Sequence, residues 1–523
     1  MKRLVACLAF FFALTPQTLS AQAPPPARGS LTIAFGAEPT TLDPVRYAAG
    51  VDLYGVSQMF EQLIRPGVDG KVVNWLAESW EVGGTSEKPI IDVRIRLGIK
   101  FHNGDAVTAS DFEFSYDRLR DPKQSRWSFF QDAVERFEVV DDLRFKIHFK
   151  KPDAVYITNF LQLWAMPKRY FNEVGIDGFA KAPVGTGPWK FVGWKVKEEL
   201  KLEAFDDYWN KTQRPTVKEL TIKFIPEDLT RVAAYKTGAV DMIDAVPLSA
   251  LAEFAKLPNT TTQSMISGNN LYMALPEHQE NSPFRDVRVR QAAALAVDMD
   301  AIIARVLFGQ GERYAEIGKG SFGYDPDLKP YPYDPAKARQ LLRDAGFPNG
   351  FEVPCYNLIT PREPNIKEMG EAYFAYLTAV GIRCKVVALE YAAWINLGRR
   401  DTAQKPLDGV FSFMYGHGVP GDPGRPWNGH LHSYIKGTGW GGSSYTSNPE
   451  IDAMVEQQNE ILDPVAREAL LKKLARKKQE TVAGGIATYR PKVTFAWRTS
   501  KVSYTPWPWP GFWHQLQQIG VKE

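Results

Sequence analysis

The stretch of sequence that decides the fold class is residues 351–389, FEVPCYNLITPREPNIKEMGEAYFAYLTAVGIRCKVVAL. An apolar segment lies at each end, and the apolar residues between them recur at helical spacing. This order is typical of a strand, a helix and a second strand. Two strands joined through a helix run parallel, and the helix covers one face of their sheet. The stretch therefore predicts a mixed α/β fold that contains a parallel sheet.

The residues on either side extend this pattern along the chain. Helices and strands alternate most clearly after residue 280, whereas earlier segments alternate apolar and polar residues, as strands do. The predicted strands are 91–97, 145–149, 199–205 and 219–224, and the predicted helical regions are 287–306, a helix opened by Asp334-Pro335 that ends near Gly346, and a long amphipathic region at 449–482.

The composition is typical of a globular chain with several domains. The 523 residues predict about two to four domains at roughly 100–200 residues each. Hydrophobic residues make up 44% and charged residues 24%, which excludes disordered, collagen-like and polytopic membrane classes. The 63 basic and 60 acidic residues are scattered, whereas a nucleic-acid binder gathers its basic residues on one face. We therefore expect no nucleic-acid partner.

The first residues predict a secretory signal peptide at 1–21. Two basic residues precede an apolar run at 4–14, and the small residues Ser20 and Ala21 follow it. The run is too short to span a bilayer core, which needs about 20 apolar residues. We expect cleavage after Ala21 or Ala23 and export to the periplasm of a Gram-negative bacterium.

Two cysteines remain after this cleavage, Cys355 and Cys384. They flank the predicted helix of residues 351–389, in segments that we expect to form adjacent parallel strands. An oxidising compartment allows a disulfide between them, but pairing neighbouring parallel strands is geometrically demanding. A disulfide and two buried free thiols both remain open at this point.

Sequence signatures of catalysis are missing from the chain. It contains no Gly-x-Ser-x-Gly, His-Glu-x-x-His or Walker-type phosphate-binding motif. His102 is predicted to cap a turn, and Asp241 and Asp244 stand in a turn that leads into a buried strand. We therefore expect no catalytic residue and no cofactor.

A loop rich in Gly and Pro carries side chains that suit ligand binding. His417, His430 and His432 are close enough in sequence to ligate a transition metal, although exposed polar residues on a loop are the simpler interpretation. Tyr415 and Trp427 lie on the same loop, and large aromatic side chains either line ligand clefts or fill cores. Loops held by rigid sheets are where binding usually resides.

Nine short phrases follow one another along residues 30–480. They are TLDP (41–44), DG (69–70) with LAESW (76–80), LGIKFHNG (97–104), TASDF (108–112), PVGTGPW (183–189), DYW (207–209), GAVD (238–241), DVRVRQA (286–292) with AVD (296–298), and YDPAKA (333–338). In this order the phrases resemble the bacterial extracellular solute-binding proteins of family 5, the peptide/nickel-type receptors of ATP-driven importers. Each phrase alone is weak, but together they cover most of the chain.

The resemblance implies a type II periplasmic binding protein fold of α/β class. Two lobes close on a solute through a hinge, and an extra β-rich domain is attached. Lobe I would comprise residues 30–52, 184–272 and 490–523. The extra domain would comprise residues 53–183, and lobe II residues 273–489.

The resemblance also implies a position for the solute. Peptide-binding relatives hold the peptide's α-ammonium group with an Asp in a phrase that precedes an Asp-Pro phrase. Asp422-Pro423 matches the second, structural phrase, which places Val419 or Gly418 at the ammonium-binding position and argues against a peptide. Alternatively, Asp422 itself takes the role after a shift of the loop.

Other residues complete the predicted pocket. The backbone after the TLDP phrase, at Tyr47, Ala48 and Ala49, lines the pocket in relatives. Arg399 and Arg400 fall near positions that meet ligand carboxylates, which a guanidinium binds through two hydrogen bonds. The full predicted set of ligand-binding residues is Tyr47, Ala48, Ala49, Arg399, Arg400, Tyr415, His417, Val419, Asp422 and Trp427.

The function that follows is transport rather than catalysis. The resemblance implies a periplasmic receptor that delivers a peptide or other small organic solute to an inner-membrane ABC permease and its ATPase. We expect the receptor to be a monomer without enzymatic activity. A receptor for a chelated metal such as nickel, and a secreted hydrolase, are the alternatives.

Overall fold

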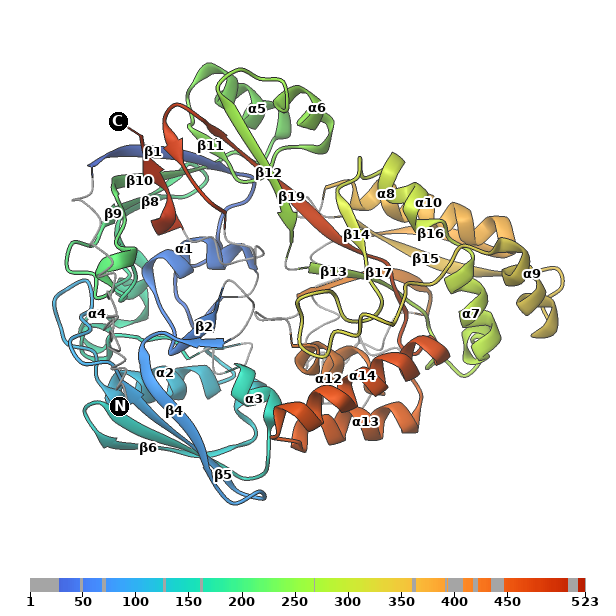
Figure 1. Cartoon of the computed structure of the whole chain (residues 1–523), viewed down its shortest axis with the longest axis horizontal. Helices are drawn as coiled ribbons and strands as arrows, with labels where there is room; N and C mark the ends of the chain where they lie inside the picture. Colours follow the sequence, from blue (N-terminus) through green and yellow to red (C-terminus); the bar gives the residue numbers. More distant parts are fainter. Residues whose placement is uncertain are drawn as a thin grey trace, which may run out of the picture.

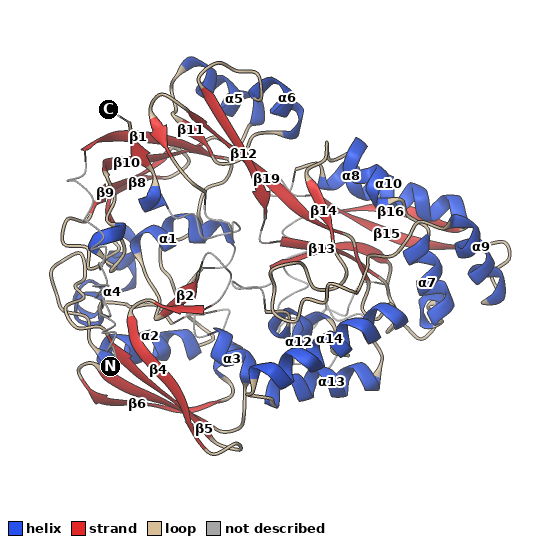
Figure 2. Ribbon diagram, in the orientation of Figure 1, coloured by secondary structure: helices blue, strands red, loops and turns tan. Residues whose placement is uncertain are grey.

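The structure is a computed structural model of the whole chain, in which helices surround several sheets (Figures 1 and 2). It describes residues 28–47, 50–67, 72–125, 128–159, 163–267, 269–359, 364–390, 393, 408–416, 422–433, 446–506 and 516–522. The predicted signal peptide lies outside the described residues.

The largest sheet has eight strands. They are β1 (Arg28–Phe35), β8 (Trp189–Lys195), β9 (Glu199–Ala204), β10 (Val217–Phe224), β11 (Met242–Ile243), β12 (Thr260–Ile266), β14 (Gly311–Arg313) and β19 (Tyr489–Arg498). Their order is β12-β19-β11-β1-β10-β9-β8, with β14 beside β19. β1 pairs in parallel with β10 and β11. The strands predicted at 199–205 and 219–224 are β9 and β10, so both predictions are confirmed.

A second sheet of five strands carries the stretch that decides the fold class. Its strands are β13 (Asn269–Ala274), β15 (Phe351–Ile359), β16 (Ile382–Glu390), β17 (Val410–Gly416) and β18 (Ile486–Ala487), in the order β16-β15-β17-β13-β18. β15 and β16 are parallel, and α10 (Ile366–Val380) packs on both of them (Figure 2). The strand, helix and strand predicted at 351–389 are therefore confirmed.

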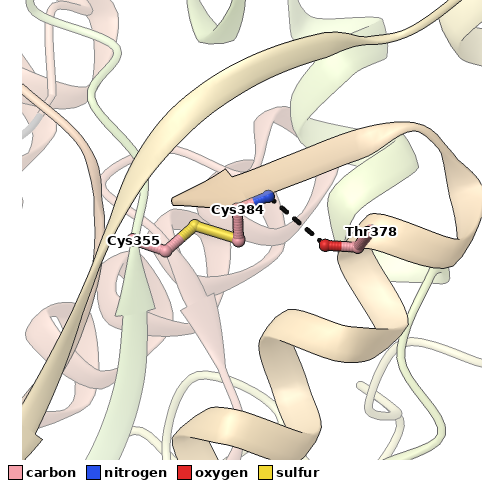
Figure 3. Close-up of a disulfide and its surroundings, with 3 residues drawn as sticks. All are labelled: Cys355, Thr378 and Cys384. Atoms are coloured by element: carbon pink, nitrogen blue, oxygen red, sulfur yellow. Dashed lines mark hydrogen bonds between the residues drawn. A yellow bond between two sulfur atoms is a disulfide. The ribbon is translucent and has the colours of Figure 1, made fainter. Parts of the chain in front are cut away.

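A disulfide joins Cys355 of β15 to Cys384 of β16 (Figure 3). Their Cα atoms lie 5.3 Å apart, within the usual range for disulfides. The amide of Cys384 also donates a hydrogen bond to Thr378 Oγ1 of α10, at 3.3 Å. Of the two states that the sequence left open, the structure has the bonded one, across neighbouring parallel strands.

A third sheet lies within residues 53–183. Its strands β4 (Ala77–Gly84), β5 (Pro89–Ile95), β6 (Val134–Asp141) and β7 (Arg144–Phe149) pair in the order β4-β5-β7-β6. β5 and β7 confirm the strands predicted at 91–97 and 145–149. Helix α2 (Ala109–Arg120) packs against this sheet, and together they bury a hydrophobic cluster of their own. We call this third sheet, together with α2, the β-rich part.

Two regions predicted as helical are each divided into two helices by an aspartate. In the region 287–306, α7 (Val287–Leu295) ends before Asp298, which caps α8 (Met299–Arg305) by accepting a hydrogen bond from the Ala301 amide at 2.9 Å. In the region 449–482, Asp463 caps α14 (Pro464–Thr481) after α13 (Pro449–Glu460) has ended. The predicted cap Asp334 does begin α9 (Pro335–Asp344).

The remaining named helices and strands are short or connect the sheets. They are α1 (Leu53–Met59), α3 (Ala154–Asn159), α4 (Lys168–Lys181), α5 (Asp228–Thr237), α6 (Leu251–Phe254), α12 (Gly424–His430), β2 (Ile64–Pro66), β3 (Val72–Asn74), β20 (Val502–Ser503) and β21 (Gly520–Val521).

The chain crosses directly from β12 of the eight-stranded sheet to β13 of the five-stranded sheet, and it crosses directly back from β18 to β19 (Figure 1). Thr488, in the return crossing, donates its amide and its hydroxyl to Leu271 O of β13, at 3.0 and 2.7 Å. Ser267, in the first crossing, donates its amide to Pro491 O of β19 at 2.6 Å. The two crossings therefore lie side by side, which is a suitable geometry for a hinge.

Candidate functional site

Two Asp-Pro phrases border the segments that the sequence predicts to bind a solute. Asp43-Pro44 lies before Tyr47, and Asp422-Pro423 lies after residues 417–421. In each phrase the Asp Oδ1 accepts a hydrogen bond from the amide two residues later, Val45 at 3.0 Å and Gly424 at 2.8 Å. Such turns fix the local backbone. The same local structure therefore borders both segments.

Asp43 is held by Arg118 of α2, in the β-rich part. The guanidinium Nη1 and Nη2 donate to the two carboxylate oxygens of Asp43, at 3.1 and 2.8 Å. The Arg118 and Asp43 side chains are only 3% and 2% exposed. Buried bidentate pairs of this kind fix orientation as well as position. The segment that leads to Tyr47 is thereby attached to α2.

Asp422 is held in the same way by Arg467 of α14. Arg467 Nη1 and Nη2 donate to the two Asp422 oxygens at 2.7 and 2.9 Å, and both side chains are buried. Arg467 Nη2 also donates to Gln458 Oε1 at 2.8 Å. Because both oxygens of Asp422 are already engaged, the structure favours the structural role of this Asp-Pro phrase over capture of an ammonium group.

Tyr47 and Tyr415 lie in different parts of the fold. Tyr47 is buried in the hydrophobic cluster of the eight-stranded sheet. Tyr415 lies near the end of β17, opposite Asn270 of β13, and β13 begins directly after the first crossing. The structure thus corrects the expectation that Tyr415 lies on the loop and places it in β17 of the five-stranded sheet, next to the two crossings.

Trp427 does not lie on a loop as predicted, and this expectation is corrected. It belongs to α12, is 1% exposed, and packs in a hydrophobic cluster with Ile451 and Leu471 of the neighbouring helices. The physical reason is the Asp-Pro turn, which orients the backbone at Gly424 to begin a helix. Of the two roles considered for Trp427, core packing is the one that the structure has.

The described histidines of the same region have structural partners. His432 forms hydrogen bonds through Nδ1 with Ser433 O and through Nε2 with Glu456 Oε1, at 3.0 and 3.1 Å. Burial opposes protonation of His432, but these two hydrogen bonds and the negative charges of Asp452 and Glu456 raise its pKa overall. His430 is buried at the end of α12. Across the described ranges, no three His, Cys, Asp or Glu side chains are grouped as a metal site requires.

Six predicted residues lie outside the part of the chain that the structure describes. They are Ala48, Ala49, Arg399, Arg400, His417 and Val419.

His102 caps a turn, as predicted. Its Nδ1 accepts a hydrogen bond from the Gly185 amide at 3.2 Å, and its Nε2 donates to Gly187 O at 2.9 Å. Burial lowers the pKa of His102 to about 4, so the ring is neutral. The turn packs so tightly that a Cβ at Gly187 would lie 2.6 Å from Met59 C. His102 therefore joins the β-rich part to the eight-stranded sheet.

Sequence reasoning missed the two arginines and one buried acid. Arg118 and Arg467 lie 75 and 45 residues from their aspartates, so nothing local indicates the pairs. Glu61 accepts hydrogen bonds from Trp75 Nε1, Tyr208 Oη and Trp209 Nε1 at 2.6, 2.6 and 3.0 Å. Burial raises its pKa and these bonds oppose the rise. The available signal was an acid in an otherwise largely apolar segment, between Met59-Phe60 and Leu63-Ile64.

Comparisons with known proteins match most of the chain. The family model described as bacterial extracellular solute-binding proteins, family 5 Middle, matches residues 71–437. The glutathione-binding protein GsiB of Pectobacterium atrosepticum is 29% identical over 370 residues, which are 68% of this chain and 69% of the relative. Heme-binding protein A of Haemophilus influenzae is 29% identical over 428 residues, 76% of this chain and 75% of the relative.

A solved structure also resembles the fold. AgaA of A. tumefaciens R10, in complex with agropinic acid, has a TM-score of 0.77 and 26% identity over 95% of this chain and 99% of that chain. Among the helices of the described residues, none combines the length and hydropathy that a bilayer crossing requires.

Proposed function

The chain belongs to the bacterial extracellular solute-binding proteins of family 5, and we propose that it captures a small organic solute and hands it on unchanged. It is the substrate-binding component of an ABC transporter. The observation that carries the proposal is the family match over residues 71–437, on a fold whose two main sheets are joined by paired crossings.

The proposed mechanism is closure of two lobes about these crossings. Residues 30–52, 184–272 and 490–523 form lobe I, residues 273–489 form lobe II, and 53–183 form the extra domain. A solute that touches both lobes binds the closed state more tightly than the open one, so it shifts the population to the closed state. No covalent step is needed.

The proposed pocket lies between Tyr47, Ala48 and Ala49 on one side and residues 415–419 on the other. The Asp-Pro turns at Asp43 and Asp422 support this assignment, because each fixes one end of a pocket segment. Arg399 and Arg400 stay in the proposal as partners of a solute carboxylate. Asp422 and Trp427 contribute to the pocket by holding the backbone rather than by touching the solute.

The solute is a peptide or another small organic molecule. The relatives bind glutathione, heme and agropinic acid, as their names state, so membership in the family leaves the solute open. The described residues give no observation in favour of the chelated-metal alternative. We place the mature receptor in the Gram-negative periplasm, as a monomer that presents its lobes to the permease.

Tryptophan fluorescence of the mature protein tests the proposal. The protein is unfolded and refolded to remove co-purified solute, and it is titrated with dipeptides, glutathione, agropinic acid, heme and nickel–histidine. We expect a saturable change with one class of solute, which mass spectrometry then recovers unaltered. Recovery of a product would overturn the proposal in favour of the hydrolase alternative. A response that needs nickel would replace the organic solute by a chelate.

A further inference from the structure

The two halves of the molecule touch at a place other than the crossings. Helix α3, which follows the β-rich part, packs against α13, next to α12 (Figure 1). This contact lies at the end of the molecule remote from the crossings of β12 and β19 (Figure 1). It joins residues within 53–183 to residues within 273–489.

Helix α3 is fixed to the β-rich part by its own side chains. Asp153 caps the helix by accepting a hydrogen bond from the Tyr156 amide at 2.8 Å. The Tyr156 hydroxyl donates to Gln131 Oε1 at 2.9 Å, and its ring packs in the core of the β-rich part. Val155 lies in sequence between Asp153 and Tyr156, and it is only 4% exposed. These contacts attach α3 to the β-rich part and thereby fix the position of Val155.

The surface that receives Val155 is the Asp422 turn. A Cβ built on Gly424 would lie 2.8 Å from Val155 Cγ2 and 2.7 Å from Gln458 Oε1, and it would also contact the Arg467 guanidinium. Only glycine leaves room for these three groups together. Val155 therefore packs directly against the backbone of Gly424, and the Asp422–Arg467 pair fixes the position of that backbone.

Charge complements this contact. Burial raises the pKa of Asp153 to about 6, and Arg467 of α14 is one of the groups that oppose the rise. The other charged groups that face Asp153 and Arg467 are Lys151, on the segment before α3, and Asp422. The buried cation of one half is therefore close enough to act on the capping acid of the other.

We propose that the contact of Val155 with Gly424 is a latch that stabilises the closed receptor independently of the solute. It rests on the proposed hinge closure: when the lobes open about the crossings, the points remote from the hinge separate most, so this contact exists only in the closed state. A contact made in one state alone shifts the population toward that state. The latch keeps part of the solute-free receptor closed and slows release of solute.

A distance measurement between the halves tests the latch without knowledge of the solute. Leu97 of the β-rich part and Val465 of α14 are 85% and 75% exposed, and the two cysteines of the mature chain are bonded to each other. Leu97→Cys and Val465→Cys therefore accept spin labels selectively. Double electron–electron resonance on the solute-free protein then gives the populations of short and long distances.

The test variant is Val155→Lys, and the matched control is Val140→Lys, on an exposed strand position of the same part. We expect Val155→Lys to reduce the ratio of short to long distances by at least about tenfold, the change that ~1.4 kcal/mol produces. Val155→Ala should change the ratio in the same direction but less, which covers the case that the lysine variant fails to fold. Val140→Lys should leave the ratio unchanged.

Two results would contradict the latch. One of them leaves the proposed hinge closure intact, and the other contradicts hinge closure as well. If the unmodified receptor populates both distances and Val155→Lys and Val155→Ala leave the ratio unchanged, the latch is wrong while hinge closure stands. If the unmodified receptor gives one narrow distance that neither the variants nor the solute panel change, hinge closure itself fails.

Discussion

Asp43 and Asp422 lie in different parts of the fold but have the same surroundings. Each accepts two hydrogen bonds from a buried arginine, and each closes a turn with an amide two residues later. Because an arginine guanidinium stays charged, removing either carboxylate leaves a buried cation without its partner. The two pairs are therefore best tested together.

We predict that Asp43→Ala and Asp422→Ala each lower the free energy of unfolding by about 3–5 kcal/mol, the cost of breaking a buried ion pair. The control is Asp117→Ala, whose Arg120 partner is 57% exposed, and it should cost no more than ~1 kcal/mol. Urea unfolding measures all three. An Asp422 variant as stable as the Asp117 variant would show that its carboxylate is not a structural anchor.

Asp244 is a buried acid with an unusual pKa. Burial raises the pKa to about 6, and Arg231 opposes the rise. The folded state therefore holds the proton more tightly than the unfolded state, whose pKa is near 3.8. The stability that this group contributes is present below about pH 4 and is lost as the pH rises through 6.

The Asp244→Asn variant tests the direction of this pH dependence of stability. Since asparagine does not titrate, the variant should gain stability relative to the parent between pH 4 and pH 7, by up to about 3 kcal/mol at ~1.4 kcal/mol per pKa unit. Urea unfolding of both proteins across that pH range gives the difference. Parallel stability curves would contradict the raised pKa.

Single residues were predictable where the signal is local. The cap at Asp334 and the turn role of His102 follow from neighbouring residues, and the structure confirms both. Trp427 was not, because the helix that buries it begins at an Asp-Pro turn held by Arg467, which is distant in sequence. Pairs of this kind form only when the fold brings them together.

At the scale of elements, the β15–α10–β16 unit is closed by the Cys355–Cys384 disulfide. We predict that replacing both cysteines with alanine lowers the free energy of unfolding by about 3–4 kcal/mol, from the chain-entropy estimate for a loop of 29 residues. Urea unfolding of the variant and of the parent measures the loss. Equal stabilities would mean that the bond does not constrain the unfolded chain.

The same scale shows where periodicity is enough and where it is not. Alternation predicted the strands β5, β7, β9 and β10, because one face of each is buried. Apolar spacing did not reveal the breaks at Asp298 and Asp463, since the helices on both sides of each break face the same core. Capping hydrogen bonds set those boundaries, and the available signals were an Asp before Met299 and an Asp before a proline at the first helical position, Pro464.

At the scale of the whole molecule, the nine ordered phrases were sufficient to predict the family, but they did not predict the identity of the solute. Several phrases supply buried contacts of the fold: DYW contributes Tyr208 and Trp209 to the Glu61 network, and TLDP contributes Asp43 to the Arg118 pair. These residues build the frame, which relatives with different solutes share. The solute contacts that we propose lie in segments such as 417–421, which the phrases do not cover.

Small-angle X-ray scattering of the mature receptor tests closure on a solute most directly. The radius of gyration is measured with the co-purified solute bound, after its removal, and after the same solute is returned. The account predicts an increase on removal and a full return on addition, with the solute recovered intact. A radius that stays constant through the cycle would contradict it.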